Sequence, residues 1–349
     1  MSLTSIISHY RGDYEKRYKG TISAAQNHAL NAILKCRSGR YGKMYLDCYQ
    51  CDVHDELNHS CGHRFCHRCQ HHDTKCWVER QQRKLLPVDY FLVTFTLPRQ
   101  LRSLAFKHQK TLYALLFDCA VSTLKTFMAN DTALQAQAGM TAVLHTHSRR
   151  LDFHPHIHVV IPSGGINRQQ KCWVQKNQDY LFRQQNLATV FRARMLDGIS
   201  EAGISLPSDL PRKWIVDCRH TGRGLSAIKY LSRYLYRGVI SEEQIVGDDG
   251  KYVTFKYVCS DTGKRKIRRL EGHAFLRLLF RHVLPKGFRR ARDYGFLHGN
   301  ARVTLQLIQL ILRVACKPVV DVKRADFLCR HCKQPMRITA FVKDIGEYG

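Results

Sequence analysis

The stretch "FHPHIHVVIP" carries a histidine at every second position, namely His154, His156 and His158. Successive side chains of a β-strand point to opposite faces, so we expect the three imidazoles in one row while Ile157 and Val159 face a core. Imidazoles held in a row on a rigid strand suit a metal ion. The alternative is the polar face of a half-buried strand, in which the histidines have no special role.

Patterns around this stretch predict a mixed α+β domain. The β-branched and aromatic run "VDYFLVTFTLP" indicates a buried strand that stops at Pro98, and helical spacing of apolar residues predicts a helix over 101–129. "MTAVLHTHS" and the histidine stretch predict a hairpin joined by "RRLD". A helix over 187–203, a strand over 213–218 and a helix over 224–238 follow. This order favours a largely antiparallel sheet packed with helices over a doubly wound parallel fold.

Charge points to a polyanionic partner. The 349 residues include 56 Lys and Arg against 28 Asp and Glu, which gives a formal net charge of +28. Each phosphate that such a chain neutralises releases counterions, although a ribosome-like or merely soluble basic protein is the other interpretation. Without an apolar run of membrane-spanning length or a signal-peptide core, we expect a cytoplasmic protein with no membrane contact. There its 14 cysteines would stay reduced and bind metal.

Two C-x-x-C pairs predict a structural zinc site near the N-terminus. Cys48 and Cys51 form one pair, Cys66 and Cys69 form the other, and 14 residues separate them. Two tight turns of this type offer four thiolates to one tetrahedral ion. A closed set of four ligands leaves no position for substrate, so this module would be structural. A mixed ligand set or a second metal stays open because further donors lie nearby, namely Cys61, His54, His59 and His63.

Two tyrosines share one face of the predicted helix over 224–238. Tyr230 and Tyr234 lie four residues apart, one turn from each other. A phenol with a pKa of about 10 is a poor nucleophile, but beside a metal-polarised phosphate or cations such as Lys229 and Arg233 it can attack phosphorus. Taken alone, the pair fits ordinary core aromatics of an amphipathic helix better.

The order of three motifs resembles a known superfamily. A strand with "FTLP", a strand with "HPHIHVVIP" and a helix with "YLSRYLYRG" resemble the three motifs of the HUH superfamily of single-stranded DNA endonucleases. The upstream cysteines and the downstream "RHVLPKGFRRARDYG" narrow this to the two-tyrosine transposases of IS91-like insertion sequences, which carry an N-terminal transposase zinc-binding domain. The resemblance implies an HUH-type antiparallel sheet packed with helices, preceded by a small zinc-binding module and followed by a basic C-terminal region.

The resemblance also implies roles for individual residues. His156 and His158 match the paired histidines that hold one divalent cation, Mg²⁺ or Mn²⁺ in the family. Tyr230 and Tyr234 match the two nucleophiles of the Y-x-x-x-Y motif. A third metal ligand is expected from one of three other histidines, namely His154, His145 and His147.

The implied activity is that of a DNA transposase. It would nick and rejoin single-stranded DNA at insertion-sequence ends through a 5′-phosphotyrosine and so drive rolling-circle type transposition. Its partners would be single-stranded DNA, transposon ends and target DNA, and the lack of a P-loop pattern predicts that a host helicase and replication machinery supply unwinding. The alternatives are a plasmid replication initiator or relaxase, although relaxases usually carry their tyrosines before the histidines, and a non-enzymatic zinc-dependent nucleic-acid-binding protein.

Residues beyond about 240 are expected to contact DNA. A hairpin over 251–272 and the later "GFRRARDYG" mix cations with aromatics such as Phe288 and Tyr294, which suits a single-stranded nucleic acid groove. A solvated basic face is the alternative. With two cations of the tyrosine helix, the expected DNA-binding residues are Lys229, Arg233, Lys264, Arg265, Lys266, Arg268, Arg269, Arg289, Arg290 and Arg292.

The sequence predicts three consecutive domains. They are a zinc-binding, DNA-binding domain over 1–85, an HUH catalytic domain over 86–240 and a basic DNA-binding region over 241–349. The last region includes an expected packed helix over 301–316. It also includes "CRHC", whose Cys329 and Cys332 form half a zinc site that distant cysteines would have to complete.

Overall fold

The chain forms two compact units, each assembled from segments distant in sequence. The computed structural model describes residues 2–167, 169–177, 180–235, 239–259, 262–315, 324 and 326–343, and of Tyr234 only the backbone. Unit 1 combines Met1–Cys76, Tyr236–Val283 and Val320–Gly349, and unit 2 combines Trp77–Leu235 and Leu284–Val319. The compact units thus differ from the three consecutive segments expected from the sequence. The assignment of zinc-binding, catalytic and DNA-binding roles to those segments stays a prediction.

Unit 2 is built on a five-stranded antiparallel sheet with strand order β12-β4-β5-β3-β8. Its strands are β3 (Tyr90–Thr96), β4 (Met140–His147), β5 (Phe153–Pro162), β8 (Val216–His220) and β12 (Ala291–Tyr294), beside a separate pair, β6 (Gly164–Asn167) and β7 (Cys172–Gln175). Its helices are α4 (Arg102–Lys107), α5 (Gln109–Asn130), α6 (Gln184–Glu201), α7 (Leu225–Leu235) and α9 (Arg302–Ile311), while α3 (His71–Gln82) runs from unit 1 into unit 2. The predicted α+β class with an antiparallel sheet is confirmed.

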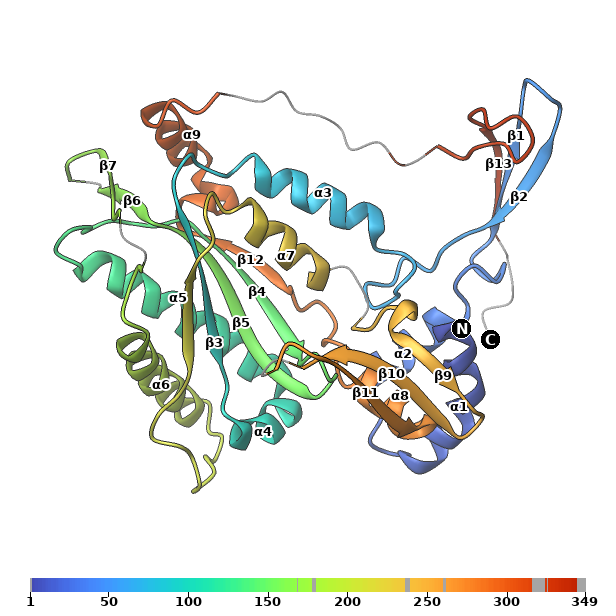
Figure 1. Cartoon of the computed structure of the whole chain (residues 1–349), viewed down its shortest axis with the longest axis horizontal. Coiled ribbons are helices and arrows are strands. Elements are labelled where there is room, and N and C mark those ends of the chain that lie inside the picture. The colour runs from blue at the N-terminus through green and yellow to red at the C-terminus, as the bar shows by residue number, and fades with distance from the viewer. Residues whose placement is uncertain are drawn as a thin grey trace. The chain divides into compact units, whose positions relative to one another are not determined.

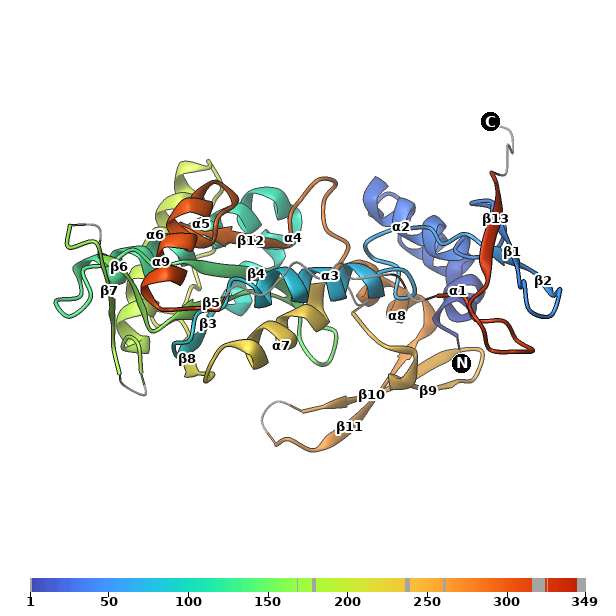
Figure 2. The same cartoon turned by 90° about the horizontal axis from the view of Figure 1, so that it is seen from above.

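The two faces of this sheet have different coverings (Figures 1 and 2). Helices α5 and α6 lie on one face, and α7 lies on the other. Ile157 and Val159 of β5 are fully buried in the core that α5 and α6 form with the sheet, as the alternation predicted. The histidines of β5 therefore belong to the opposite face, on the side of α7.

Helix α5 is the main support of the core face. The helix predicted over 101–129 is interrupted at His108, whose non-helical backbone separates α4 from α5. Within the described part of the chain, α5 alone is long and apolar enough to cross a membrane by length and composition, and 56% of its most apolar window is buried. Leu116, Phe117 and Ala120 lie fully buried in the core of unit 2, so α5 packs as a core helix of this unit.

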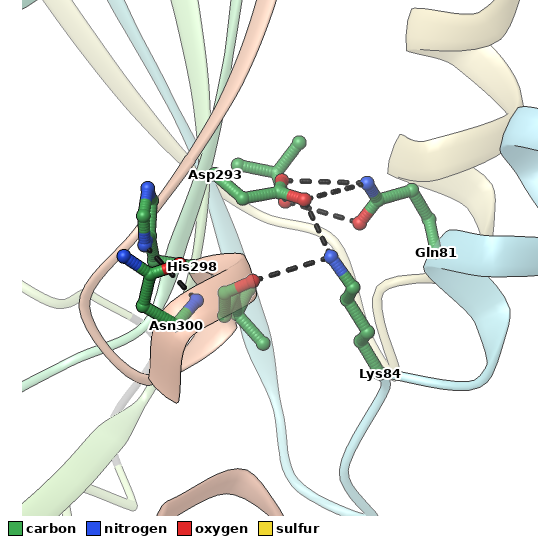
Figure 3. A network of polar contacts seen from close by, with 7 residues as sticks. Gln81, Lys84, Asp293, His298 and Asn300 are labelled. Carbon is green, nitrogen blue, oxygen red and sulfur yellow. Dashed lines mark hydrogen bonds and ion pairs between the residues drawn. The ribbon is translucent and has the colours of Figure 1, made fainter. Parts of the chain in front are cut away.

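A polar network ties the end of α3 to the edge of the sheet (Figure 3). Asp293 on β12 accepts a hydrogen bond from Nε2 of Gln81 at 3.1 Å and forms an ion pair with Nζ of Lys84 at 2.6 Å. Lys84 also donates to the carbonyl oxygen of Leu297 at 3.2 Å, and Thr141 on β4 donates to Asp293 at 2.7 Å. One carboxylate thus joins a helix end and two strands.

Unit 1 combines three helices with two small sheets. Its helices are α1 (Leu3–Arg17), α2 (Ala24–Leu34) and α8 (Gly272–Phe280). One antiparallel sheet contains β9 (Ile245–Asp248), β10 (Tyr252–Val258) and β11 (Arg265–Glu271), which confirms the hairpin predicted over 251–272. The other contains β1 (Lys43–Asp47), β2 (His54–Asn58) and β13 (Arg337–Val342), with β1 at its centre.

Close packing joins α1 to α8 at a glycine. A Cβ at Gly272 would lie 2.1 Å from the ring of Tyr10, so no larger residue fits there without movement. The hydroxyl of Tyr10 donates to Asp248 on β9 at 2.5 Å, which fixes the ring that Gly272 accommodates. Gly272 therefore lets α1, α8 and β9 meet.

Helix α9 differs from its prediction as a packed helix. Ile308 is buried, but Val303 and Leu310 are 79% and 75% exposed. The apolar spacing correctly predicted a helix, whereas only one side of it packs against the described residues.

Candidate active site and metal centres

Three histidines from neighbouring strands meet on the sheet face opposite α5 and α6. His145 on β4 is the direct cross-strand partner of His156 on β5, and His158 follows two positions later. The ring centroids of His145 and His158 are 4.3 Å apart, and those of His156 and His158 are 4.8 Å apart. The possible ligand atoms of all three lie within 4.8 Å of one another. Of the three candidates for the third position, the structure brings His145 into the group.

The other two candidates lie outside this group. His147 is paired with Phe153 beyond an irregularity in the β4–β5 register, which shifts it away from the row. The ring of His154 contacts the guanidinium group of Arg102 through Nδ1. Strand β5 continues without interruption through Pro155, the residue after His154.

Hydrogen bonds leave suitable imidazole nitrogens for a metal ion. Nδ1 of His156 lies 2.7 Å from the carbonyl oxygen of His154, which can only accept, so Nδ1 carries the proton and Nε2 keeps a lone pair. Nδ1 of His158 lies 2.9 Å from Oγ1 of Thr94, and the buried Nε2 of His158 has no hydrogen-bond partner among the described residues. Such outer contacts are what orients histidine ligands in metal sites. The group therefore fits a divalent cation.

Burial keeps these imidazoles neutral near pH 7. It lowers the pKa of His145 and that of His158 well below the ordinary value, and it lowers the pKa of His156 to about 4. Repulsion between neighbouring imidazoles acts in the same direction on His145 and His158. Neutral imidazoles have the free lone pairs that metal binding requires.

Helix α7 brings Tyr230 to the histidine group. The ring centroid of Tyr230 lies 5.7 Å from that of His158 and 6.4 Å from that of His145. Ile228 and Leu231 of α7 are buried, whereas Tyr230 is half-buried beside the histidines and so is not one of the core aromatics of this helix. Lys229 and Arg233 are exposed on the same helix. The backbone of Tyr234 continues α7 one turn later, and its side chain lies outside the described residues.

Gly224 defines where α7 begins. It has a φ of +80°, and a Cβ there would lie 2.8 Å from the ring of Tyr90. Only glycine adopts this backbone readily and leaves room for the buried Tyr90. The turn therefore sets the position at which α7 starts toward the histidines.

The four cysteines predicted to form one zinc site are divided between two clusters. Cys66 and Cys69 gather with Cys36 and Cys61, whereas Cys48 and Cys51 gather with Cys329 and Cys332. The expected site of Cys48, Cys51, Cys66 and Cys69 is corrected accordingly. The reason is that Cys48 and Cys51 form the turn between β1 and β2, which faces the terminal C-x-x-C turn beside β13.

The first cluster has the dimensions of a tetrahedral zinc site. Zn–S bonds of about 2.3 Å place thiolate sulfurs about 3.8 Å apart in a tetrahedron. The Sγ atom of Cys69 lies 3.4 Å from that of Cys36 and 3.6 Å from that of Cys61, and the Cys36 and Cys66 sulfurs are 3.7 Å apart. Cys61 was weighed as a ligand from the sequence, but Cys36 was missed because it lies alone, after α2.

The predicted DNA-binding cations of unit 1 lie along the β10–β11 hairpin. Lys264, Arg265 and Lys266 are exposed, while Arg268 is half-buried. Arg269 forms an ion pair with Asp249 at 2.6 Å and stacks over the ring of Tyr252 at 4.2 Å from its centroid. The first three therefore offer the more accessible charge.

The predicted DNA-binding cations of unit 2 differ in their exposure and in their contacts. Arg289 is exposed, but Arg290 donates to the carbonyl oxygen of Leu235 at 3.3 Å, at the last residue of α7. Arg292 is half-buried over the rings of Phe117 and Phe288, with centroid distances of 4.2 and 5.1 Å. Phe288 belongs to the core with only 7% exposure, so its expected role in base stacking is not supported.

Two contacts of the site were absent from the sequence interpretation. Thr94 faces His158 because β3 pairs with β5 in a register that sets these two residues opposite each other. Arg102, at the start of α4, reaches His154 from a different element. The alternation of the strand containing Thr94 could have indicated its face, but the register depends on the folded sheet.

Two family models match separate segments of the chain. A family described as "Transposase zinc-binding domain" matches residues 6–97, and one described as "Putative transposase" matches residues 139–304. A protein called "Putative transposase y4qJ" from Sinorhizobium fredii is 30% identical over 314 residues, covering 83% of this chain and 79% of that protein. The transposase for insertion sequence element IS801 from Pseudomonas savastanoi pv. phaseolicola is 25% identical over 298 residues, covering 80% and 72%.

Solved structures with some likeness are conjugative relaxases. TrwC in complex with mutant OriT DNA has a TM-score of 0.29 and 17% identity, and the match covers 64% of this chain and 74% of that one. Metal-bound TrwC with OriT DNA has a TM-score of 0.28 and 20% identity, with 40% of this chain and 51% of that chain covered.

Proposed function

We propose a function for this chain, which belongs to the IS91-like family of transposases. In this proposal it nicks and rejoins single-stranded DNA at insertion-sequence ends through a 5′-phosphotyrosine. This reaction would drive rolling-circle type transposition. The observation that carries the proposal is the placement of Tyr230 beside the group of His145, His156 and His158. A nucleophile and a candidate cation site on one sheet face are the two parts that phosphoryl transfer needs.

In this proposal the histidine group holds one divalent cation, Mg²⁺ or Mn²⁺. When bound, the ion would act as a Lewis acid on a non-bridging oxygen of the scissile phosphate. His145, His156 and His158 supply three ligands and leave further coordination positions for DNA and water. Thr94 and the carbonyl oxygen of His154 contact Nδ1 of His158 and of His156, so Nε2 of each ring would be the atom that binds the ion.

Tyr230 is the proposed nucleophile of the first strand cleavage. Its phenol oxygen loses a proton and attacks the phosphorus atom, so that an O–P bond forms as the P–O3′ bond breaks. The departing 3′-oxygen takes up a proton and leaves as a 3′-OH. The number of P–O bonds does not change, so a 3′-OH can later attack the phosphotyrosine and reseal a strand.

Tyr234 is the proposed second nucleophile. Its position one turn after Tyr230 in α7 puts both residues on one helical face. One tyrosine could then keep one DNA end attached while the other cuts a second end. This is what the transfer of a single strand between two sites requires.

Exposed cations would guide the DNA strand. Lys229 and Arg233 flank the tyrosines on α7, and Lys264, Arg265 and Lys266 lie along the hairpin of unit 1. Such cations bind phosphates without reading the base sequence. The proposal also assigns DNA binding to Arg268, Arg269, Arg289, Arg290 and Arg292. Three of these, Arg269, Arg290 and Arg292, also make contacts within the protein.

The remaining parts of the proposal concern the DNA-binding segments, the host proteins and the location in the cell. The zinc-binding segment near the N-terminus and the basic segments beyond residue 240 would bind transposon ends and target DNA. A host helicase and the replication machinery would unwind the duplex in the cytoplasm, where the protein would associate with the nucleoid. The catalytic function would belong to residues 86–240.

Detection of a covalent adduct tests the proposal. Full-length protein is incubated with end-labelled single-stranded DNA that carries the element's terminus, with Mg²⁺ or Mn²⁺, and run on a denaturing gel. We expect a protein-linked label with the wild type and with Tyr180→Phe, a matched control at an exposed tyrosine of unit 2. The label should disappear in the Tyr230→Phe, Tyr234→Phe double variant because no phenol oxygen is left on α7 to attack. An adduct that persists in the double variant, or no adduct and no nick with the wild type, would contradict the proposal.

A further inference from the structure

We infer that Cys48, Cys51, Cys329 and Cys332 hold a second structural zinc ion, which fastens residues 326–343 to the β1–β2 hairpin. Two of these ligands lie beyond both segments matched by the transposase families, which end at residue 304. The inference concerns the architecture of unit 1 and does not depend on the proposed strand cleavage.

The two cysteine pairs form turns with the same backbone hydrogen bonds. In the first turn, Cys48 donates its N–H to the carbonyl oxygen of Val53 at 3.0 Å, and Asp52 donates to that of Cys48 at 3.1 Å. In the second turn, Cys329 donates to the carbonyl oxygen of Gln334 at 2.8 Å, and Lys333 donates to that of Cys329 at 3.0 Å. Each pattern joins the first cysteine to the residues four and five positions later.

The backbone angles repeat as well. Asp52 and Lys333, each directly after the second cysteine of its pair, adopt the left-handed conformation with φ values of 54° and 60°. Only a few per cent of non-glycine residues adopt this conformation. The two turns therefore share an uncommon backbone geometry and face each other. In sequence, Cys51 and Cys332 are 281 positions apart. A pair of equivalent turns is how two C-x-x-C motifs enclose one zinc ion.

The sulfur atoms are spaced for zinc binding. The Sγ atom of Cys51 lies 3.4 Å from that of Cys329, 3.5 Å from that of Cys48 and 3.6 Å from that of Cys332. These separations approach the edge of about 3.8 Å that a tetrahedron of thiolates around zinc would have. They exceed by far the length of about 2.05 Å of a disulfide bond. All four cysteines are free.

The apolar core beside this cluster is too small to hold the strands alone. β13 pairs with β1 and so adds a third strand to the hairpin. Among the residues that the structure describes, the buried apolar residues that accompany the cysteines are Leu46 and Met336, with partly buried neighbours around them. Modules with so little core usually need a metal or disulfides to fold. The zinc would supply the missing stability.

Metal content tests the inference directly. We would count zinc in purified full-length protein that carries His156→Ala and His158→Ala, so that the histidine group does not contribute. Two ions per chain are expected, one for each cysteine cluster. Addition of Cys329→Ser and Cys332→Ser should leave one ion, whereas Cys172→Ser, at a cysteine outside both clusters, should leave two. One ion in the parent protein, or two in the Cys329 and Cys332 variant, would overturn the inference.

Thiol protection in the wild type keeps the test independent of variant folding. Full-length protein is treated with an alkylating reagent, and the modified cysteines are followed over time by mass spectrometry. We expect Cys329 and Cys332 to react at least about tenfold more slowly than Cys172, because a thiolate bound to zinc is not a free nucleophile. Removal of zinc with a mercurial and a chelator, followed by removal of the mercurial, should abolish this protection for Cys48 and Cys51 as well. Reaction of Cys329 and Cys332 at the rate of Cys172 in the untreated protein would show that they bind no metal.

Discussion

Oγ1 of Thr94 on β3 lies 2.9 Å from Nδ1 of His158 on β5, and no other described residue is hydrogen-bonded to that ring. When Nδ1–H donates to the hydroxyl, the lone pair of Nε2 is directed at the other two imidazoles. The strand next to the histidine strand thus orients one of the three candidate ligands.

Loss of this hydroxyl should weaken cation binding. We expect Thr94→Val, which keeps the shape of the side chain, to lower the affinity for Mn²⁺ by about 10- to 100-fold, as is typical when the outer contact of a histidine ligand is removed. Thr94→Ser keeps the hydroxyl and should bind nearly as the wild type does. Calorimetric titration with Mn²⁺ measures both. Equal affinities for the valine and serine variants would mean that Thr94 does not position His158.

Acid should destabilise the protein when the histidine group carries no cation. Unfolded His156 takes up a proton near its ordinary pKa of about 6.5, whereas burial keeps the pKa in the folded state at about 4. Between these values the unfolded chain binds more protons, so the free energy of unfolding decreases as the pH falls. At pH 5 the loss from His156 amounts to about 2 kcal/mol relative to pH 7.

Urea unfolding at pH 7 and pH 5 measures this effect. The protein is first dialysed free of Mg²⁺ and Mn²⁺ under conditions that leave thiolate-bound zinc in place. The decrease in the free energy of unfolding should be smaller in His156→Gln than in the wild type, and unchanged in His220→Gln, a histidine at an exposed site on β8. If His156→Gln loses as much stability as the wild type, the buried neutral imidazole is not responsible.

The ion pair between Lys84 and Asp293 should couple α3 to the sheet. Its side chains are 27% and 20% exposed, and the carboxylate has two further hydrogen-bond donors. A double-mutant cycle with Lys84→Met and Asp293→Asn should give a coupling energy of about 1–2 kcal/mol. The pair of Arg83 and Glu79 on the same segment is a control and should give about 0.3–0.5 kcal/mol. Equal coupling in the two cycles would contradict a special role for Asp293.

Two glycines of unit 1 should respond oppositely to alanine. Gly272→Ala places a methyl group against the ring of Tyr10 and should reduce the free energy of unfolding by about 1–3 kcal/mol. Gly12, exposed within α1, has no atom within 4 Å of an added Cβ, so Gly12→Ala should increase stability by about 0.5–1 kcal/mol. Thermal unfolding of both variants tests this. A neutral Gly272→Ala would show that α1 and α8 separate easily.

The sequence predicted unit 2 well where the signal was local. The period of two in β5 gave the faces of Ile157 and His158 correctly, and helical spacing placed Tyr230 on α7. The choice of His145 over His147 and His154 could not be made, because it depends on the register between β4 and β5 and on an irregularity within it.

The cysteines show where such reasoning stops. Each C-x-x-C turn is encoded by neighbouring residues, but the choice of partner turn is made by the fold. Two pairs close together in sequence, at Cys51 and Cys66, were therefore joined in the prediction. In the structure Cys51 instead meets Cys329, because β13 returns to β1.

The pairing of β13 with β1 joins two segments that the ribosome makes at different times. Cys51 and Cys329 are separated by 278 positions, and ribosomes add about 5–20 residues per second, so about 15–55 seconds pass between the synthesis of the two. Throughout this interval the β1–β2 hairpin would have only two of the four cysteines of the proposed second zinc site. A chain released early, before residue 329, would have no means of completing this sheet. Synthesis of the segment that contains β13 would thus be the step that completes the sheet of β1, β2 and β13.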